Sequence, residues 1–344
     1  TGFGSAAARQ QLQRAVKLDP ACAGAWNCLG HCLWAGGPPE AALALACFER
    51  GLQARPGNKE GLRQRGVLRR QMATAAASEG GEGGDNSAEL AASIQDAKAA
   101  VQQDVSDGYS WYLLGTAHLM AGAGRLDGPA MLQALAAYQQ AEKLGIAIPD
   151  LFFNRGILQR HLQRYGPALE DMRRAQALDP ELPCAAQIQS LGAILAILQR
   201  GVQSVEGLPR SKLSAAASAL AAAALPGDAL AELTPGRNEG RALACRVMRV
   251  LHGGPPVHFV GMDAGGRLGA VAVAGLAEGV LLEGHNLLIS APELEALEHV
   301  DPNSGKASCI TLVRVTEPSR MTLNGTEALP SEPAALQVRA SYGA

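Results

Sequence analysis

Residues 151–180, LFFNRGILQRHLQRYGPALEDMRRAQALDP, constrain the fold more than any other stretch of the chain. The segment has the pattern of a helical hairpin. Gly156 and Ala168 lie where its two helices cross, and a larger side chain at either position would push the helices apart. Pro180 ends the second helix because proline cannot continue an α-helix. A single hairpin cannot bury its own apolar face, so the segment predicts neighbouring hairpins of the same kind.

The same register recurs along the first half of the chain. In residues 151–180, small or apolar residues follow Phe152 at offsets of 4, 16, 20 and 23, with proline at offset 28. Related units start at Trp26, Leu62 and Trp111, and a second helix of the same type contains Ala8, Leu12 and Ala15. This is the spacing of tetratricopeptide repeats. Residues 1–200 are therefore predicted to form a tetratricopeptide repeat (TPR) α-solenoid, with Glu181–Gln199 as its capping helix.

From Arg241 the apolar pattern changes from helical to alternating. Five short runs rich in β-forming residues are bounded by turn sequences, and they cover residues 242–251, 257–263, 268–276, 285–291 and 307–316. This pattern predicts a small closed or nearly closed β-barrel of the OB-fold type over residues 241–328. Residues 201–240 are predicted to be a linker with one Ala-rich helix, and residues 329–344 a C-terminal tail. The predicted fold class is thus multidomain α + β, a TPR α-solenoid followed by a β-barrel.

The composition argues against several classes of function. The chain has 30 Lys and Arg against 32 Asp and Glu, so it lacks the basic field of a generic nucleic-acid or membrane-surface binder. Its longest apolar run, Leu213–Leu225, is too short to cross a bilayer. Seven cysteines, an odd number, are typical of reduced thiols in a protein of the cytoplasm and nucleus.

No residue set for catalysis can be assembled from the sequence, and we expect a protein that is not an enzyme and needs no cofactor. The motifs of serine hydrolases, P-loop NTPases and zincins are missing. Cys28, His31 and Cys32 share one helical turn, but no second ligand pair follows, so they are interpreted as packing residues and no metal site is predicted. The low-complexity segment Ala73–Ala88 predicts a disordered loop, and Asn324-Gly325-Thr326 predicts a hairpin turn.

Binding residues are easier to predict than catalytic ones. In TPR arrays the concave groove is formed by the first helix of each repeat, mainly at repeat positions 2, 5, 9 and 12. With Trp26, Leu62, Trp111 and Phe152 as position 4, the groove combines charges with aromatic rings, and Arg69 and Arg155 border it. The predicted groove residues are Asn27, His31, Glu60, Arg63, Arg70, Tyr109, Tyr112, Asp150, Phe153 and Arg160.

This combination is typical of peptide recognition, because aromatic rings supply contact area while charged groups fix the register of the peptide. The alternative is that these residues are only solvated helix faces. A clamp for a C-terminal carboxylate is disfavoured, because it would need lysine and asparagine at successive positions that here hold Asn27, Arg63, Tyr112 and Phe153.

The predicted barrel is a poor candidate for single-stranded nucleic acid. Such barrels stack bases on aromatic side chains within a basic groove. Residues 241–344 contain only Phe259 and Tyr342 as aromatic residues, with eight basic against ten acidic side chains. A protein-binding or spacer role is favoured.

Several segments together resemble the tetratricopeptide repeat protein 5 (Strap) family. They include AVKLDPACAGAWNCLG, IPDLFFNRG, YGPALEDMRRAQALDP, VHFVGMD and LVRVTEPSRMTLNG, and they follow the family's order from repeats to barrel. The resemblance implies a non-enzymatic adaptor with two described roles. One is a cytosolic factor in tubulin autoregulation, which reads the N-terminal peptide of nascent tubulin at the ribosome and triggers decay of tubulin mRNA through recruited factors. The other is a nuclear, stress-responsive transcriptional cofactor that docks transcription factors and an acetyltransferase.

The resemblance also assigns residues. The family's groove arginine matches Arg69 and its groove aspartate matches Asp150. A further acidic groove residue of the family falls at or near Cys184 in this chain, so that contact is not carried over. The basic residues that the family uses at the ribosome correspond to Arg210 and Lys212, in a run that is poorer in lysine here.

Overall fold

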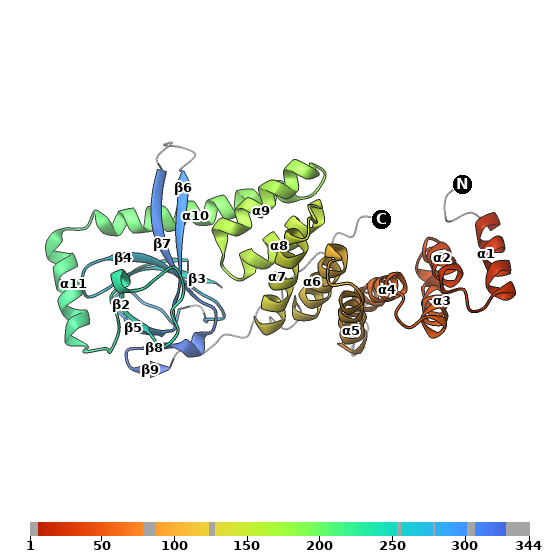
Figure 1. Ribbon diagram of the computed structural model, residues 1–344. Coiled ribbons are helices and arrows are strands. Elements are labelled where there is room, and N and C mark those ends of the chain that lie inside the picture. The colour runs from red at the N-terminus through yellow and green to blue at the C-terminus, as the bar shows by residue number, and fades with distance from the viewer. Residues whose placement is uncertain are drawn as a thin grey trace. The chain divides into compact units, whose positions relative to one another are not determined.

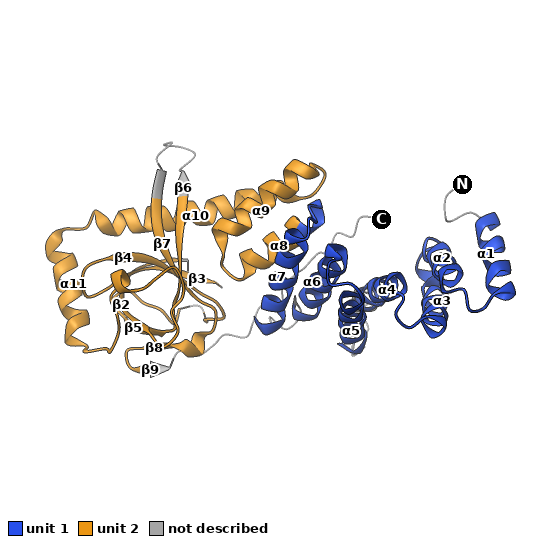
Figure 2. Ribbon diagram, viewed as in Figure 1, with its two compact units in different colours: residues 1–151, 335–344 blue, residues 152–334 orange. Residues whose placement is uncertain are grey.

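The computed structural model describes residues 6–78, 87–123, 128–252, 256–277, 279–300 and 307–327 (Figure 1). They divide into two compact units, one within residues 1–151 and one within residues 152–334 (Figure 2). The predicted tail, residues 329–344, lies outside the described residues.

Unit 1 is a row of helices that pack as antiparallel hairpins, α2 with α3, α4 with α5 and α6 with α7. A Cβ atom added to Gly30 would lie 2.7 Å from the Phe48 ring, and one added to Gly115 would lie 2.8 Å from the Tyr138 ring. A larger side chain would therefore clash where the helices of these two repeats cross, and the predicted TPR architecture is confirmed. The helices are α1 (Ala6–Leu18), α2 (Ala23–Trp34), α3 (Ala41–Ala54), α4 (Lys59–Ser78), α5 (Ser87–Gln103), α6 (Gly108–Ala123), α7 (Gly128–Lys143) and the start of α8 (Pro149–His161).

Unit 2 joins the last hairpin to the sheet. It holds most of α8, then α9 (Tyr165–Leu178), α10 (Cys184–Glu206) and α11 (Arg210–Ala222). α10 packs against β2 (Ala242–His252), β3 (Val257–Met262), β4 (Leu268–Val273) and β7 (Ala307–Val315), and α9 packs against β6 (Glu293–Val300). The domain boundary that we predicted at residue 200 falls inside α10, because the apolar face of this helix continues through Val202 and Val205, which are buried.

The described strands of unit 2 form one sheet in the order β1-β6-β7-β4-β3-β2-β5-β8-β9. Every ladder is antiparallel except β4–β7, and no ladder joins β1 to β9 within the described residues, so the sheet is not closed. Its inner face holds a core that includes Phe259, Val271, Leu287 and Val313. The strands are β1 (Gly236–Arg237), β2 (Ala242–His252), β3 (Val257–Met262), β4 (Leu268–Val273), β5 (Asn286–Ser290), β6 (Glu293–Val300), β7 (Ala307–Val315), β8 (Met321–Leu323) and β9 (Thr326–Glu327).

The five predicted strands are confirmed as β2, β3, β4, β5 and β7. The turn predicted at Asn324-Gly325 is confirmed between β8 and β9, where both residues have positive φ, 48° and 87°. The disordered loop predicted over Ala73–Ala88 is wrong at both ends, since Ser87 and Ala88 already belong to α5. α4 continues to Ser78 because alanine is the strongest helix former and Ala73 is buried. Residues 79–86 lie outside the described residues.

Candidate functional site

A pocket of about 820 Å³ opens on the first helices of successive repeats in unit 1. Each of these helices presents one face to the pocket, because residues three and four positions apart share a side of an α-helix. The lining residues come from α2 (His31, Trp34, Ala35), α4 (Val67, Arg70, Gln71), α6 (Tyr109, Tyr112, Leu113, Thr116) and the segment that leads into and starts α8 (Ile148, Asp150).

Two opposite charges and a set of aromatic rings share this pocket. Arg70 is 2% exposed and its Nη1 donates a hydrogen bond to Ser93 Oγ at 3.1 Å. The Tyr109 and Tyr112 ring centroids lie 5.7 Å apart. Burial raises the pKa of Tyr112, and the negative charge of Asp150 raises it further. The pocket therefore places a basic and an acidic side chain beside two aromatic rings.

Arg69 lies in a different environment from its neighbour Arg70. Its Nη1 is 3.1 Å from Asp96 Oδ2, and two further carboxylates, of Glu49 and Glu89, lie 3.5 Å from its guanidinium. Successive helical residues point about 100° apart, so only one of two adjacent arginines can face the groove. Of this pair, Arg70 lines the pocket, whereas Arg69 joins α4 to α3 and α5.

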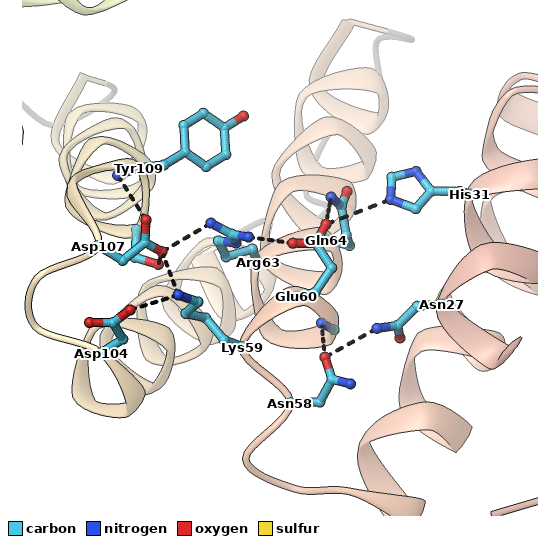
Figure 3. A network of polar contacts seen from close by, with 12 residues as sticks. Asn27, His31, Asn58, Lys59, Glu60, Arg63, Gln64, Asp104, Asp107 and Tyr109 are labelled. Carbon is cyan, nitrogen blue, oxygen red and sulfur yellow. Dashed lines mark hydrogen bonds and ion pairs between the residues drawn. The ribbon is translucent and has the colours of Figure 1, made fainter. Parts of the chain in front are cut away.

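A network of polar contacts links the first helices of three repeats at this pocket (Figure 3). At its centre the Arg63 guanidinium contacts Glu60 and donates to Asp107 Oδ2 at 3.0 Å. Lys59 Nζ lies 3.4 Å from the same Asp107 oxygen and 2.8 Å from Asp104 Oδ2. The charge of Arg63, a predicted groove residue, is thus compensated within the protein.

This network also positions Tyr109, the most exposed aromatic residue of the pocket at 41%. The Arg63 guanidinium lies over the Tyr109 ring, 5.3 Å from its centroid. The Tyr109 backbone N–H donates to Asp107 Oδ1 at 3.2 Å, which caps the start of α6. We interpret Arg63 as a residue that holds an aromatic platform in place.

The network makes a prediction about acid stability. The pKa of Glu60 is lowered to about 2, first by the hydrogen bond with His31 and then by those with Gln64 and Arg63. A carboxylate whose pKa is lower in the folded state stabilises the fold above its unfolded pKa, and this contribution is lost as the pH falls toward 2. We expect Glu60→Gln to lower the thermal midpoint at pH 6 and to reduce its fall between pH 4.5 and 2. Thermal melts of this variant and of the exposed control Glu181→Gln measure this. If the thermal midpoints of Glu60→Gln and Glu181→Gln depend on pH in the same way, Glu60 does not make this contribution to stability.

Three of the residues predicted at or beside the groove belong to unit 2. Phe153 is buried at 7% exposure, and the Arg160 guanidinium contacts Gln187 and donates to Ser190 Oγ on α10 at 3.0 Å. The expectation that Arg155 borders the groove is wrong. Arg155 is 5% exposed and makes a two-pronged ion pair with Asp171, both bonds 2.7 Å long.

The positional rule could have found three lining residues that we did not predict. Trp34 is at position 12 of its repeat, and Val67 and Thr116 are at position 9 of theirs. The other unpredicted lining residues, Ala35, Gln71, Leu113 and Ile148, have no such signal in the sequence. Within the described part of the chain, no group of three His, Cys, Asp or Glu side chains could hold a metal ion, and no helix there is long and apolar enough to span a bilayer.

Comparison with known proteins decides the family. The chain is 33% identical to tetratricopeptide repeat protein 5 of Bos taurus over 358 residues, which cover 96% of this chain and 79% of that protein. The human protein is also 33% identical, over 92% of this chain and 76% of its own length. The chain belongs to the tetratricopeptide repeat protein 5 family. No family model matches the chain. A thermophilic TPR protein of Thermus thermophilus is 18% identical and covers 54% of this chain and 89% of its own, with a TM-score of 0.42, too low to bear on the fold.

The remaining residues that the resemblance to the tetratricopeptide repeat protein 5 family singled out lie in unit 2. Cys184, where the family has an acidic residue, is fully buried at the start of α10, and burial raises the pKa of its thiol. Arg210 and Lys212 are exposed in the first turn of α11. Neither basic side chain makes an ion pair with the residues that the structure describes.

Proposed function

We propose that this protein is a non-enzymatic adaptor whose unit 1 pocket binds a short peptide with both an acidic and a basic group. The observation that carries the proposal is that Arg70 and Asp150 line one pocket together with the Tyr109 and Tyr112 rings. Such a pocket fits a peptide whose acidic group meets the arginine and whose basic group meets the aspartate. The tyrosines supply area with little loss of side-chain entropy.

The family suggests a specific peptide, the N-terminus of nascent tubulin, which would make this protein a factor that triggers tubulin mRNA decay at the ribosome. It would act in the cytoplasm, with a nuclear pool for a second role. The sheet of unit 2 would serve as the OB-type domain of the family, as a protein-binding or spacer element without nucleic-acid or membrane contact.

Peptide binding should depend on the charged pair of the pocket. We expect Asp150→Ala and Arg70→Ala each to weaken binding of a tubulin N-terminal peptide by about 10- to 150-fold, since a hydrogen bond to a charged group contributes about 1.5–3 kcal/mol. Fluorescence anisotropy with the labelled peptide measures this. The exposed Arg55→Ala serves as a control for a charge lost elsewhere on unit 1.

Two outcomes of this experiment separate the possible sites. If Arg69→Ala weakens peptide binding and Arg70→Ala does not, Arg69 is the arginine that binds the peptide. Unchanged affinity in the Asp150, Arg70 and Arg69 variants would show that this pocket is not the peptide-binding site. Since Arg70 is buried, circular dichroism of Arg70→Ala must first show an intact solenoid. Arg70→Lys, which retains the charge but not the planar fork, provides a milder variant.

A second role, as a nuclear coactivator scaffold that docks transcription factors and an acetyltransferase, would use the same solenoid. The exposed Arg210 and Lys212 on α11 favour the ribosomal role, because exposed cations suit contact with a polyanion. We expect Arg210→Glu combined with Lys212→Glu to reduce co-sedimentation with ribosomes at physiological salt by at least about fivefold, since each lost phosphate contact also removes a counterion-release contribution. Sedimentation that is unaffected by both reversals would favour the scaffold role.

A further inference from the structure

A second pocket, of about 230 Å³, lies within unit 2 between α10 and the sheet. It is separate from the pocket of unit 1 and plays no part in the peptide binding proposed there. α10 contributes Gln199, Val202, Gln203 and Glu206, and the sheet contributes Leu268, Cys309, Ile310 and Thr311.

Within the part of the chain that the structure describes, one edge of β7 has no strand partner at this pocket. β7 pairs with β6 from Ala307 to Arg314, but its ladder with β4 starts only at Leu312. Among the described residues, no strand pairs with the preceding part of β7 on the β4 side. The backbone N–H of Ala274, which follows β4, donates to Val315 O at 2.9 Å, so Val315 points its backbone groups toward the β4 side. Backbone groups alternate along a strand, and those of Cys309 therefore point to the same side, at the free edge.

Natural sheets guard their edges with charged side chains, prolines or bulges, or cover them with a helix or loop. α10 packs against β7 but leaves the pocket beside this edge, and the edge sequence itself carries none of the guarding residues. β6, on the other side of β7, carries the exposed Glu298 in the part that has no ladder with β1. The free part of β7 reads Ala-Ser-Cys-Ile-Thr, with neither charge nor proline. The contrast indicates that β7 can accept another strand.

A buried amide faces the same space. Gln199 is 3% exposed and lines the pocket. Its side chain makes no hydrogen bond or ion pair with any residue that the structure describes. Its carboxamide offers one acceptor and two donor hydrogens, which complement a peptide group. The apolar lining, with Val202 and Ile310 both buried, would cover one face of an incoming backbone.

We propose that an extended segment of a partner protein binds here as an added strand, pairing with the backbone of Cys309 and with the amide of Gln199. Such β-augmentation takes its affinity from main-chain hydrogen bonds and its specificity from alternate side chains. The segment would carry small or β-branched residues, as the narrow pocket requires. It would also carry a basic residue, because Glu206 lines the pocket and Glu298, which lies opposite Cys309, is exposed.

A phage-displayed library of random ten-residue peptides, selected on the full chain, tests this proposal. Cys309→Pro removes the backbone N–H that points to the free edge. Cys309→Thr changes the same side chain but keeps this N–H. Gln199→Leu removes the amide at similar volume. We expect selected peptides to bind wild type and Cys309→Thr equally. They should bind Cys309→Pro and Gln199→Leu at least about tenfold more weakly. On Glu206→Lys, selection should no longer favour peptides with a basic residue. Asp150→Ala should leave this binding unchanged, which distinguishes it from the groove.

Hydrogen exchange gives the second readout. Bound peptide should protect the amide of Cys309 in wild type. The proposal is overturned if no selected peptide discriminates Cys309→Pro and Gln199→Leu from wild type, or if binding leaves the exchange of Cys309 unchanged. It is also overturned if this amide is already protected without peptide and becomes exposed when residues 329–344 are removed, because the edge would then be covered by the chain itself.

Discussion

Replacing Arg155 by alanine is expected to lower the free energy of unfolding of unit 2 by about 3–5 kcal/mol, because it leaves the Asp171 carboxylate buried without its partner. The side chains of Arg155 and Asp171 are only 6% and 4% exposed, and the two hydrogen bonds between them, each 2.7 Å long, join the helices of the last hairpin. Removal of one member of such a pair costs far more than the pair itself contributes.

The other repeats suggest the control for this experiment. The residue before the crossing glycine is Arg155 here but leucine in two other repeats, where Leu29 faces Cys47 and Leu114 faces Ala137 in apolar clusters. The double variant Arg155→Leu, Asp171→Ala copies the apolar arrangement of Leu114 and Ala137. We expect it to recover most of the stability that Arg155→Ala loses. Urea unfolding followed by circular dichroism, with hydrogen exchange of α8 and α9, measures both. A double variant no more stable than Arg155→Ala would contradict the account.

The same ion pair shows what sequence could and could not predict. The repeat register placed the helices correctly, because Gly156, Gly30 and Gly115 lie where a larger side chain would clash with the second helix of the hairpin. It did not reveal that Arg155 is buried. An arginine beside the glycine of the helix crossing is easily taken for a groove residue until its partner on the second helix is known. Asp171 lies 16 residues away on a different helix, and single-sequence patterns do not report such a pairing.

The groove shows a related limit. The positional rule selects Arg70, whereas the family resemblance selects Arg69, and the structure places Arg70 in the pocket. Arg69 and Arg70 are adjacent in sequence but face different sides of α4, so a shift of one residue in alignment changes the environment completely. Strand β6 was not predicted from the sequence, for a different reason. Its sequence, ELEALEHV, is rich in helix formers, and its ladder with β7 holds it as a strand.

Replacing Arg314 by leucine is expected to destabilise unit 2 by about 3 kcal/mol, because two partly buried carboxylates would lose their main counter-charge. Arg314 on β7 is 6% exposed at its side chain, with Nη2 at 2.9 Å from Glu293 and Nη1 at 3.7 Å from Glu295. Burial lowers the pKa of Arg314 and raises that of Glu295. Arg164 would remain, at 3.9 Å from Glu293.

The deficit should depend on pH in a defined direction. A carboxyl group whose pKa is raised in the folded state binds more protons there than in the unfolded state, so stability falls as the pH rises through that pKa. Without Arg314 the pKa of Glu295 rises further, and the deficit of Arg314→Leu should shrink as the pH is lowered from about 7.5 to about 5. Adding Glu295→Gln to Arg314→Leu should recover part of the loss at the higher pH.

The chain supplies an internal reporter for this experiment. Its three tryptophans, Trp26, Trp34 and Trp111, all belong to unit 1. The urea midpoint of Arg314→Leu should therefore fall further when it is followed by circular dichroism than when it is followed by tryptophan fluorescence. Hydrogen exchange should show weaker protection of β6 and β7. Arg237→Leu, which removes an exposed ion pair with Glu239 from the same unit, should change stability by less than about 1 kcal/mol. If Arg314→Leu behaves like Arg237→Leu at every pH, then Arg314 contributes no more to unit 2 than an exposed surface charge.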